Sequence, residues 1–238
     1  MAEYKFPTEM VDLPSKGYFY FEGHPLSSGK VEVKYMTAKE EDILTSQNLI
    51  QQGTVIDKLL ESLIVDKSIK LDDMLIGDKN AIMLSARILG YGKQYEFTYD
   101  GEEQSVDLST LEPLDIDFSK FPKGKNEFNF KLPTSEREVT FKLLTGKSEK
   151  DIDLEIKAKQ KISKTQSSEL TTRLKHMIIS VDGSSEKSYI NNFVDNEFLS
   201  RDSLAFRQYL ASITPDVDMN VEVVDSDGKK TEVAVPIT

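Results

Sequence analysis

Short runs of alternating apolar and polar residues recur along the chain and predict paired β-strands. In the first of them, Val31, Val33 and Tyr35 alternate with charged residues, which is the pattern of a half-buried strand. The aromatic run Tyr18 to Phe21 precedes this strand across a loop that is rich in turn-forming residues. We therefore predict a β-hairpin whose aromatic strand, Tyr18 to Phe21, is exposed.

Further segments carry the same signature. The alternating run Tyr95 to Tyr99 leads to Asp100-Gly101, a strong signal for a tight hairpin turn, and the chain then returns as a partner strand. Residues 126–145 again consist of two β runs around a loop. A last hairpin is predicted at residues 221–235, around the turn-forming residues 225–228.

Between the hairpins of the first half, apolar residues return at helical spacing. Thr37 and Glu40 form a capping-box signature at the start of the first predicted helix. A second helix is expected at residues 55–64, where the apolar residues form one stripe. Asp78 is expected to cap a third helix over residues 79–90, which ends in glycines.

The second half repeats this programme. Ser148 and Asp151 form a cap pair at the start of a helix that runs to about residue 162. A second helix is predicted over residues 169–181, with Leu174 on its apolar face. Asp202 is expected to cap the last helix, which ends before Pro215.

The two halves keep a common spacing, which favours an internal duplication. An offset of 108 takes Val31 to Val139 and Thr37 to Thr145, and an offset of 124 takes Asp78 to Asp202. The fold predicted is α+β, with two tandem pseudo-repeats of β-hairpin, about three helices and β-hairpin. The alternative is an ordinary α+β chain, which offers similar caps and stripes without any duplication.

The same reasoning gives provisional boundaries. Residues 1–16 are expected to be an extended N-terminal arm, and residues 17–108 form the first α+β repeat. Residues 109–125 contain two prolines and no periodicity, which is typical of a linker packed on the surface. Residues 126–238 form the second α+β repeat.

Composition narrows the functional classes. The 238-residue chain has a net charge of −11, which disfavours nucleic acid and anionic membranes as partners. It contains no cysteine, so disulfides, thiolate metal sites and thiol nucleophiles are excluded. No run approaches the roughly 18 apolar residues of a membrane span, and the N-terminus lacks the apolar region of a secretory signal. The basic stretch at residues 157–164 is interpreted as a solvated helix face.

No motif in the chain indicates catalysis or a cofactor. His24 and His176 have no second histidine at metal-ligand spacing, and they are interpreted as surface or boundary residues. The acidic runs at residues 115–117 and 225–228 lack the other ligands of a calcium loop. The paired glycines near residue 90 stand at a helix end, whereas dinucleotide loops need glycines at a helix start. A hydrolase with an unrecognised site stays open as an alternative.

Long ordered strings in the chain resemble one protein family. They include LPSKG at residues 13–17, MLIGDKNAIMLSARILGYGKQYEF at residues 74–97 and FVDNEFLSRDSLAFRQYLASITPDVDM at residues 193–219. In these strings, and across roughly residues 13–220, the chain resembles the baseplate hub and hub-assembly proteins of T-even-type contractile-tailed bacteriophages. Some members carry a Cys-x-x-Cys pair in the hairpin after the third helix, but here residues 98–105 contain no cysteine, so a zinc role is not transferred.

The resemblance implies a non-enzymatic structural or assembly subunit of the tail baseplate hub, which acts by protein–protein binding. The alternative within the family is a transient hub-assembly chaperone that is absent from the mature virion. The expected partners are other phage tail proteins, with no cofactor, metal, nucleic acid, membrane or small-molecule substrate. The expected location is the host cytoplasm during assembly and the virion tail afterwards.

Candidate partner-binding residues lie at the first helix start, in the aromatic strands and among the arginines that could pair with acidic partner surfaces. They are Tyr18, Phe19, Tyr20, Phe21, Thr37, Glu40, Arg87, Tyr95, Phe97, Arg201 and Arg207. For each aromatic residue an ordinary core role is equally open, and for each arginine a solvated salt bridge is the alternative.

Overall fold

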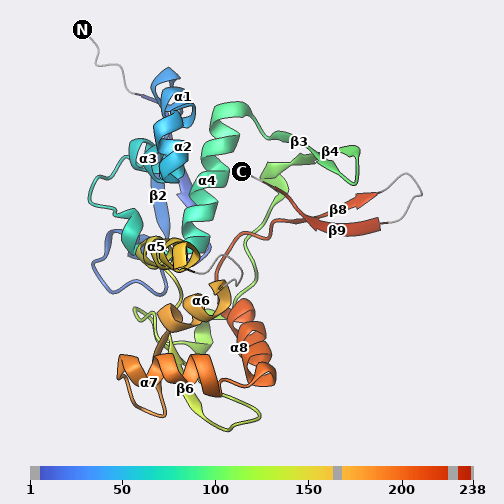
Figure 1. Cartoon of the computed structure of the whole chain (residues 1–238). Helices are drawn as coiled ribbons and strands as arrows, with labels where there is room; N and C mark the ends of the chain where they lie inside the picture. Colours follow the sequence, from blue (N-terminus) through green and yellow to red (C-terminus); the bar gives the residue numbers. More distant parts are fainter. Residues whose placement is uncertain (1–5, 163–167, 225–229, 237–238) are drawn as a thin grey trace.

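The structure is a computed structural model that describes residues 6–162, 168–224 and 230–236. Helices and small antiparallel sheets alternate along the chain, which confirms the predicted mixed α+β class. In Figure 1 the first half of the chain lies above and most of the second half lies below. The turn predicted at residues 225–228 and part of the basic stretch at residues 157–164 lie outside the described residues.

The elements of the first half follow one another closely. In chain order they are β1 (Thr8–Asp12), η1 (Pro25–Ser28), β2 (Lys30–Lys34), α1 (Ala38–Leu44), α2 (Gln47–Gln52), α3 (Val55–Leu63), η2 (Leu71–Asp73), α4 (Ile76–Tyr91), β3 (Gln94–Tyr99), β4 (Glu102–Asp107) and η3 (Leu108–Thr110).

Residues 111–117 are irregular apart from a bridge at Pro113, and the remaining elements follow them. These elements are η4 (Phe118–Lys120), β5 (Phe128–Lys131), β6 (Glu138–Phe141), α5 (Gly146–Ile162), α6 (Glu169–Met177), β7 (Ile178–Val181), α7 (Lys187–Asn192), the π-helical turn η5 (Phe193–Glu197), α8 (Ser200–Ile213), β8 (Asn220–Val224) and β9 (Lys230–Ala234).

The first hairpin differs from the predicted one. The strand that pairs with β2 is β1, inside the segment predicted as an arm, with Val11 opposite Val31. The aromatic run Tyr18 to Phe21 is a turn and not a strand, so that prediction was wrong. Its flanking glycines, Gly17 and Gly23, have positive φ angles of 72° and 86°, which bend the chain away from an extended path.

Several helix starts lie earlier than predicted. The helices α4 and α8 begin at Ile76 and Ser200, so Asp78 and Asp202 stand in the first turn and are not caps. The helix α5 begins at Gly146, ahead of the cap pair assigned by sequence. Acidic residues are favourable both at the cap and in the first turn of a helix. The sequence pattern alone therefore does not distinguish these two positions.

The predicted helix at residues 169–181 is divided. The helix α6 ends at Met177, and residues 178–181 form β7, which pairs with β6 in a three-stranded sheet. The apolar pair Ile178 and Ile179 fits either structure, and pairing with β6 decides in favour of the strand. The helix α7 and the turn η5 follow where no element was predicted.

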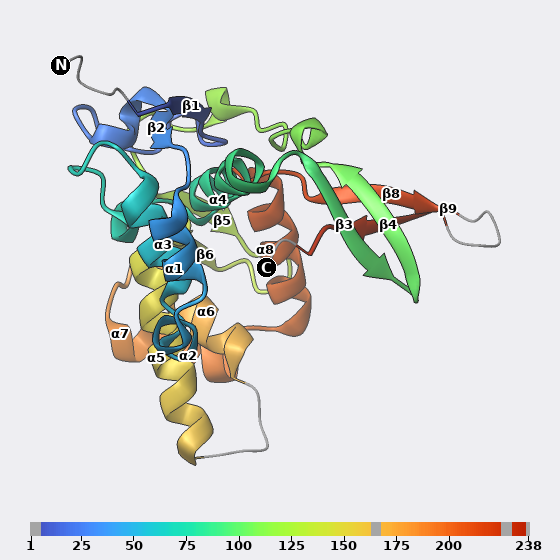
Figure 2. The same ribbon diagram turned by 90° about the horizontal axis from the view of Figure 1, so that it is seen from above.

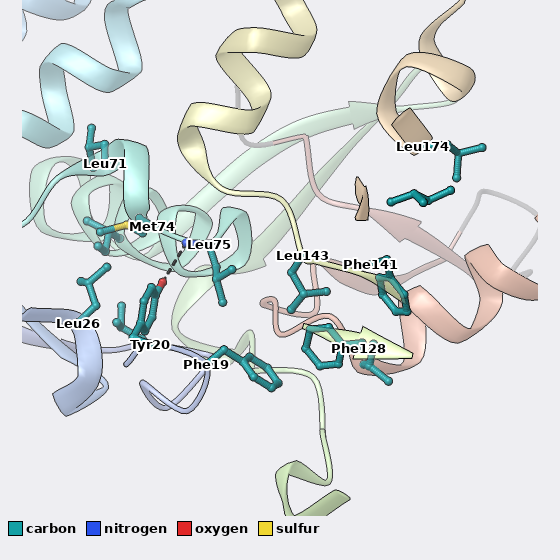
Figure 3. Packing of buried hydrophobic residues seen from close by; sticks show 14 of the residues in the cluster. Phe19, Tyr20, Leu26, Leu71, Met74, Leu75, Phe128, Phe141, Leu143 and Leu174 are labelled. Carbon is teal, nitrogen blue, oxygen red and sulfur yellow. Dashed lines mark hydrogen bonds between the residues drawn. The ribbon is translucent and has the colours of Figure 1, made fainter. Parts of the chain in front are cut away.

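One apolar core joins the two halves. In Figure 3, Phe19 from the first half lies close to Phe128 from the second, and Leu75 lies between Tyr20 and Leu143. The Phe19 and Phe128 ring centroids are 5.1 Å apart, and Phe128 stacks in turn near Phe141 at 5.5 Å. Edge-to-face and offset aromatic pairs of this kind add to the stabilisation that burial provides.

The order of elements is similar in the two halves, although the tandem duplication stays a prediction. In each half a hairpin is followed by helices, by a short bridge back to that hairpin, and by a long helix with a terminal ribbon. The bridge is Val33 to Ile64 in the first half and Phe141 to Ile178 in the second. The boundaries at residues 16, 108 and 125 also stay predictions.

Two β-ribbons project together from the body. One is β3–β4 and the other is β8–β9, and Figures 1 and 2 both show them leaving the body in the same direction, side by side. The ribbon β8–β9 therefore reaches from the second half back to the first. Two main-chain hydrogen bonds join the segment between the halves to the base of β8–β9. They run from Leu114 N to Asp216 O and from Asp218 N to Glu112 O.

Candidate interaction surfaces

The two ribbons, which we call the double ribbon, pack on each other and on α4 through a small apolar cluster. Its buried members are Ala81, Leu84, Leu108, Val217 and Val235, and partly buried residues around them include Tyr95, Phe97, Val106, Met219 and Val221. The Tyr95 hydroxyl also donates a 2.6 Å hydrogen bond to Pro236 O. This cluster fixes the base of the double ribbon to the body.

The strands of the double ribbon pair only within their own ribbon in the part of the chain that the structure describes, so each ribbon is a separate two-stranded sheet. The turn residues Asp100 and Gly101 both have positive φ, as a two-residue turn requires, and Tyr99 pairs with Glu102 beside it. In such a hairpin that pair is hydrogen-bonded, so the N–H groups of Thr98 and Glu103 point outward from the ribbon.

Arg87 and Tyr95, both predicted partner-binding residues, come together at the root of β3. The Arg87 guanidinium lies 5.4 Å from the Tyr95 ring centroid and 4.8 Å from that of Tyr91. Its Nη1 atom is buried and has no hydrogen-bond partner among the described residues. A guanidinium nitrogen without a partner is costly to bury, so this position favours an incoming acceptor.

Beside Arg87 an open apolar groove, which we call the α1–α4 groove, has a volume of about 160 Å³. It is lined by Met36, Leu44, Ile56, Leu59, Met83, Ala86, Arg87, Tyr91 and Tyr95. Methionine side chains adapt to different apolar partners because they are flexible and polarisable. Sequence reasoning missed this groove, since its walls come from the segment between β2 and α1, and from α1, α3, α4 and β3.

The pair Thr37 and Glu40 forms the predicted capping box, and it is structural. Glu40 is fully buried and accepts hydrogen bonds from Thr37 N at 2.9 Å, Ser62 Oγ at 2.6 Å and Lys34 Nζ at 2.8 Å. Burial disfavours the charged carboxyl, but these donors outweigh it and lower the pKa of Glu40 below its usual range. Glu40 is therefore not available to a partner.

The aromatic run Tyr18 to Phe21, predicted to be exposed, is mostly internal, and that expectation was wrong. Phe19 and Tyr20 are buried, and the half-buried Tyr18 donates a 2.9 Å hydrogen bond to Phe121 O. Phe21 alone stays open, with 63 % of its surface exposed. The reason is that the turn between Gly17 and Gly23 directs the aromatic rings into the core shared by the two halves.

Tyr20 belongs to a buried polar network that also holds the start of α4. Its hydroxyl donates a 2.6 Å hydrogen bond to Asp78 and accepts one from Leu75 N, shown in Figure 3. Ser15 donates to the same carboxylate through its N–H and its hydroxyl. Burial raises the pKa of both Asp78 and Tyr20, with the neighbouring groups modifying the shift.

Asp202 occupies the matching place in α8. Its carboxylate is fully buried and accepts hydrogen bonds from Thr134 N at 2.7 Å and Ser135 N at 3.0 Å, in the β5–β6 loop. Burial alone would raise the pKa of Asp202, but these N–H donors lower it. The offset of 124 relates Asp78 to Asp202 in the sequence. Both were predicted to be helix caps, whereas both lie in the first turn.

Arg201 and Arg207 are exposed on α8, away from any ion pair within the described residues. Arg207 Nε donates a 3.3 Å hydrogen bond to Ser203 O. Lys93, at the root of β3, pairs with Asp107 at 2.9 Å. The arginines therefore stay candidates for acidic partners, whereas Lys93 already has a partner.

The described residues contain no group of three or more His, Cys, Asp or Glu side chains placed to hold a metal ion. His24 Nδ1 accepts a 3.1 Å hydrogen bond from Leu26 N, and His176 lies 3.0 Å from Glu155. No helix in this part of the chain is long and apolar enough to cross a membrane.

The fold defines a class, namely a mixed α+β protein with small antiparallel sheets, and its surface carries projecting ribbons and an apolar groove. More specifically, the chain belongs to the T4 bacteriophage base plate protein family, whose family model matches residues 8–235. This confirms the baseplate resemblance drawn from sequence. No curated protein and no solved structure matches the chain.

Proposed function

We propose that the chain is a non-enzymatic subunit of the baseplate hub, and that it acts by binding other tail proteins through the double ribbon. Membership in the baseplate family places its work among other tail and baseplate proteins. The hub location and the mode of binding go beyond that membership. The observation that supports this mode of binding is the pair of ribbons projecting from the body with separate edges (Figure 2).

The physics of strand edges supports this assignment. A two-stranded ribbon is marginally stable in water, and its unpaired N–H and C=O groups are a template for a further strand. Here the inner faces are anchored to α4, so the ordering cost of the ribbon is already met before a partner arrives. A tail protein that adds a strand to an edge would gain main-chain hydrogen bonds at little conformational cost.

Proline substitution at the ribbon edge tests this mode of binding. Thr98→Pro and Glu103→Pro each remove one outward N–H group but leave the inner ladder intact. Affinity capture from infected cells should recover roughly tenfold less of a tail protein with these variants than with the natural chain, for a loss of about 1–2 kcal/mol. Matched variants Thr98→Val and Glu103→Thr keep the N–H groups and should capture normally.

Two outcomes of this experiment would contradict the proposal. If the proline variants and the matched variants capture the same tail proteins equally well, the ribbon edges are not the binding surface. If the natural chain captures no tail protein, the hub proposal itself fails. A transient chaperone, the alternative within the family, would capture tail proteins from infected cells and yet be missing from finished virions.

A further inference from the structure

The start of α4 packs against the second half of the chain. Leu75 forms an antiparallel bridge with Thr145, while Ile76 N donates to Leu144 O at 3.3 Å and Gly146 N donates to Met74 O at 2.9 Å. Leu75 is only 3 % exposed as a result. We call residues 74–77 the plug of the first half.

The second half carries a plug of the same form. Leu199 precedes α8 as Leu75 precedes α4, with φ and ψ of −60° and 141° against −60° and 147°. In both helices a buried aspartate of the first turn accepts a hydrogen bond from the hairpin loop of the same half. Asp78 accepts from Ser15 N at 2.9 Å, and Asp202 accepts from Ser135 N at 3.0 Å. Leu199, however, is 47 % exposed, so nothing in the described chain receives it as a socket receives Leu75.

The surfaces that could receive a plug also differ between the two halves. In the second half the pocket beside the plug is lined in part by Leu144, Leu210 and Pro215. The offsets of 108 and 124 take these positions to Met36, Ala86 and Tyr91, which line the α1–α4 groove. That groove is open, so the first half has a socket without a plug and the second half has a plug without a socket.

We propose that a second copy of the chain docks residues 198–201 into the α1–α4 groove, head to tail, as residues 74–77 dock within one chain. This inference rests on the predicted tandem repeat. Leu199 would enter between Met36 and Tyr91, and the buried Arg87 Nη1 would gain a main-chain carbonyl as acceptor. Such a contact joins different surfaces of the two copies, so it builds rings or open chains.

The contact between copies is looser than the internal one. The internal contact depends on Gly77 and Gly146, because an added Cβ would overlap Pro215 O or Leu71 O. The corresponding positions are Arg201 and Ala38, so the chains must stay further apart there. The net charge of −11 also opposes association, and added salt should strengthen it by screening.

The absence of cysteine allows a direct test by disulfide trapping. Met36 and Ser200 correspond to Leu144 and Ile76, which are joined by a main-chain hydrogen bond. Purified Met36→Cys and Ser200→Cys chains, mixed under mild oxidation, should give roughly tenfold more cross-linked dimer than Met36→Cys mixed with a Ser188→Cys control. A double variant, Ile76→Cys with Leu144→Cys, should form its disulfide within one chain and serves as the positive control.

A second measurement tests whether the purified chain associates with itself. In sedimentation velocity the natural chain should gain mass with rising concentration, whereas Leu199→Asp, at an exposed position, should stay monomeric. Equal cross-linking in both mixtures, or a monomeric natural chain at all concentrations, would overturn the inference. Both experiments use the purified chain alone, so they can fail while the capture of tail proteins through the double ribbon succeeds.

Discussion

Two carboxylates at matching places show how neighbouring groups decide the state of a buried residue. Asp78 and Asp202 are both fully buried in the first turn of a long helix. Asp202 receives two backbone N–H groups, and its pKa is lowered. Asp78 lies beside Tyr20, and burial raises its pKa. Two aspartates at similar places in their helices therefore have opposite effects on stability as pH changes.

Glu40 provides a prediction at this scale. Because its folded pKa is lowered, its contribution to stability is present at neutral pH and is lost as pH falls below the ordinary glutamate value of about 4.3. Glu40→Gln should reduce the free energy of unfolding by about 2 kcal/mol at pH 7, since Lys34 then loses a buried charged partner. Urea unfolding at pH 7 and pH 3 would measure this.

A matched control for Glu40 lies on the same helix. Glu41 is exposed, and Glu41→Gln should leave the unfolding midpoint nearly unchanged at both pH values. The difference between the natural chain and Glu40→Gln should shrink at pH 3. A difference that stays constant with pH would show that hydrogen-bond geometry, and not the charge, accounts for the loss.

At the scale of elements, two glycines permit the close contact between the halves. Gly77 in α4 faces Pro215 O and Gly146 in α5 faces Leu71 O, and neither site has space for a Cβ. Gly77→Ala should therefore destabilise the fold by about 3 kcal/mol or more, because backbone must move. Thermal unfolding followed by circular dichroism would measure the change.

Gly90 is the control for that prediction. An added Cβ there meets the sulfur of Met36 at 2.6 Å, and this flexible side chain can move aside. Gly90 also lies inside α4, where alanine is favoured over glycine by up to about 1 kcal/mol. Gly90→Ala should thus be close to neutral, and a loss equal to that of Gly77→Ala would contradict the account.

Local signals predicted some elements well and others poorly. The β3–β4 hairpin was predicted because Asp100-Gly101 marks its turn within the strands that it joins. The pairing of β1 with β2 was missed because the two strands are separated by a loop that contains the more strand-like run Tyr18 to Phe21. Tertiary contacts, which a single sequence does not display, determine that Tyr18 to Phe21 forms a turn and that residues 178–181 form the strand β7.

The candidate site divides in the same way. Arg87 and Tyr95 come together at the root of β3, and Phe97 packs in the apolar cluster of the double ribbon, while their role in binding a partner stays a prediction. Other residues that line the groove with Arg87, such as Met36, come from segments far apart in the chain. No spacing rule brings such residues together, so the groove became visible only in the folded structure.

At the scale of the whole molecule, the chain has one main apolar core and two projecting ribbons. The aromatic contacts through Phe19 and Phe128 tie the halves together (Figure 3). The ribbon β8–β9 crosses from the second half to lie beside β3–β4 (Figure 1). The two ribbons therefore come from different halves of the chain and leave the body in the same direction.

The central claim is that this chain is a built-in subunit of the baseplate hub. The most direct test is quantitative mass spectrometry of purified tails from the phage that encodes it, calibrated against known tail proteins. The account predicts that the chain is present in a fixed ratio to hub proteins and remains after high-salt washing. Its absence from finished tails, with presence in infected cells, would contradict the account.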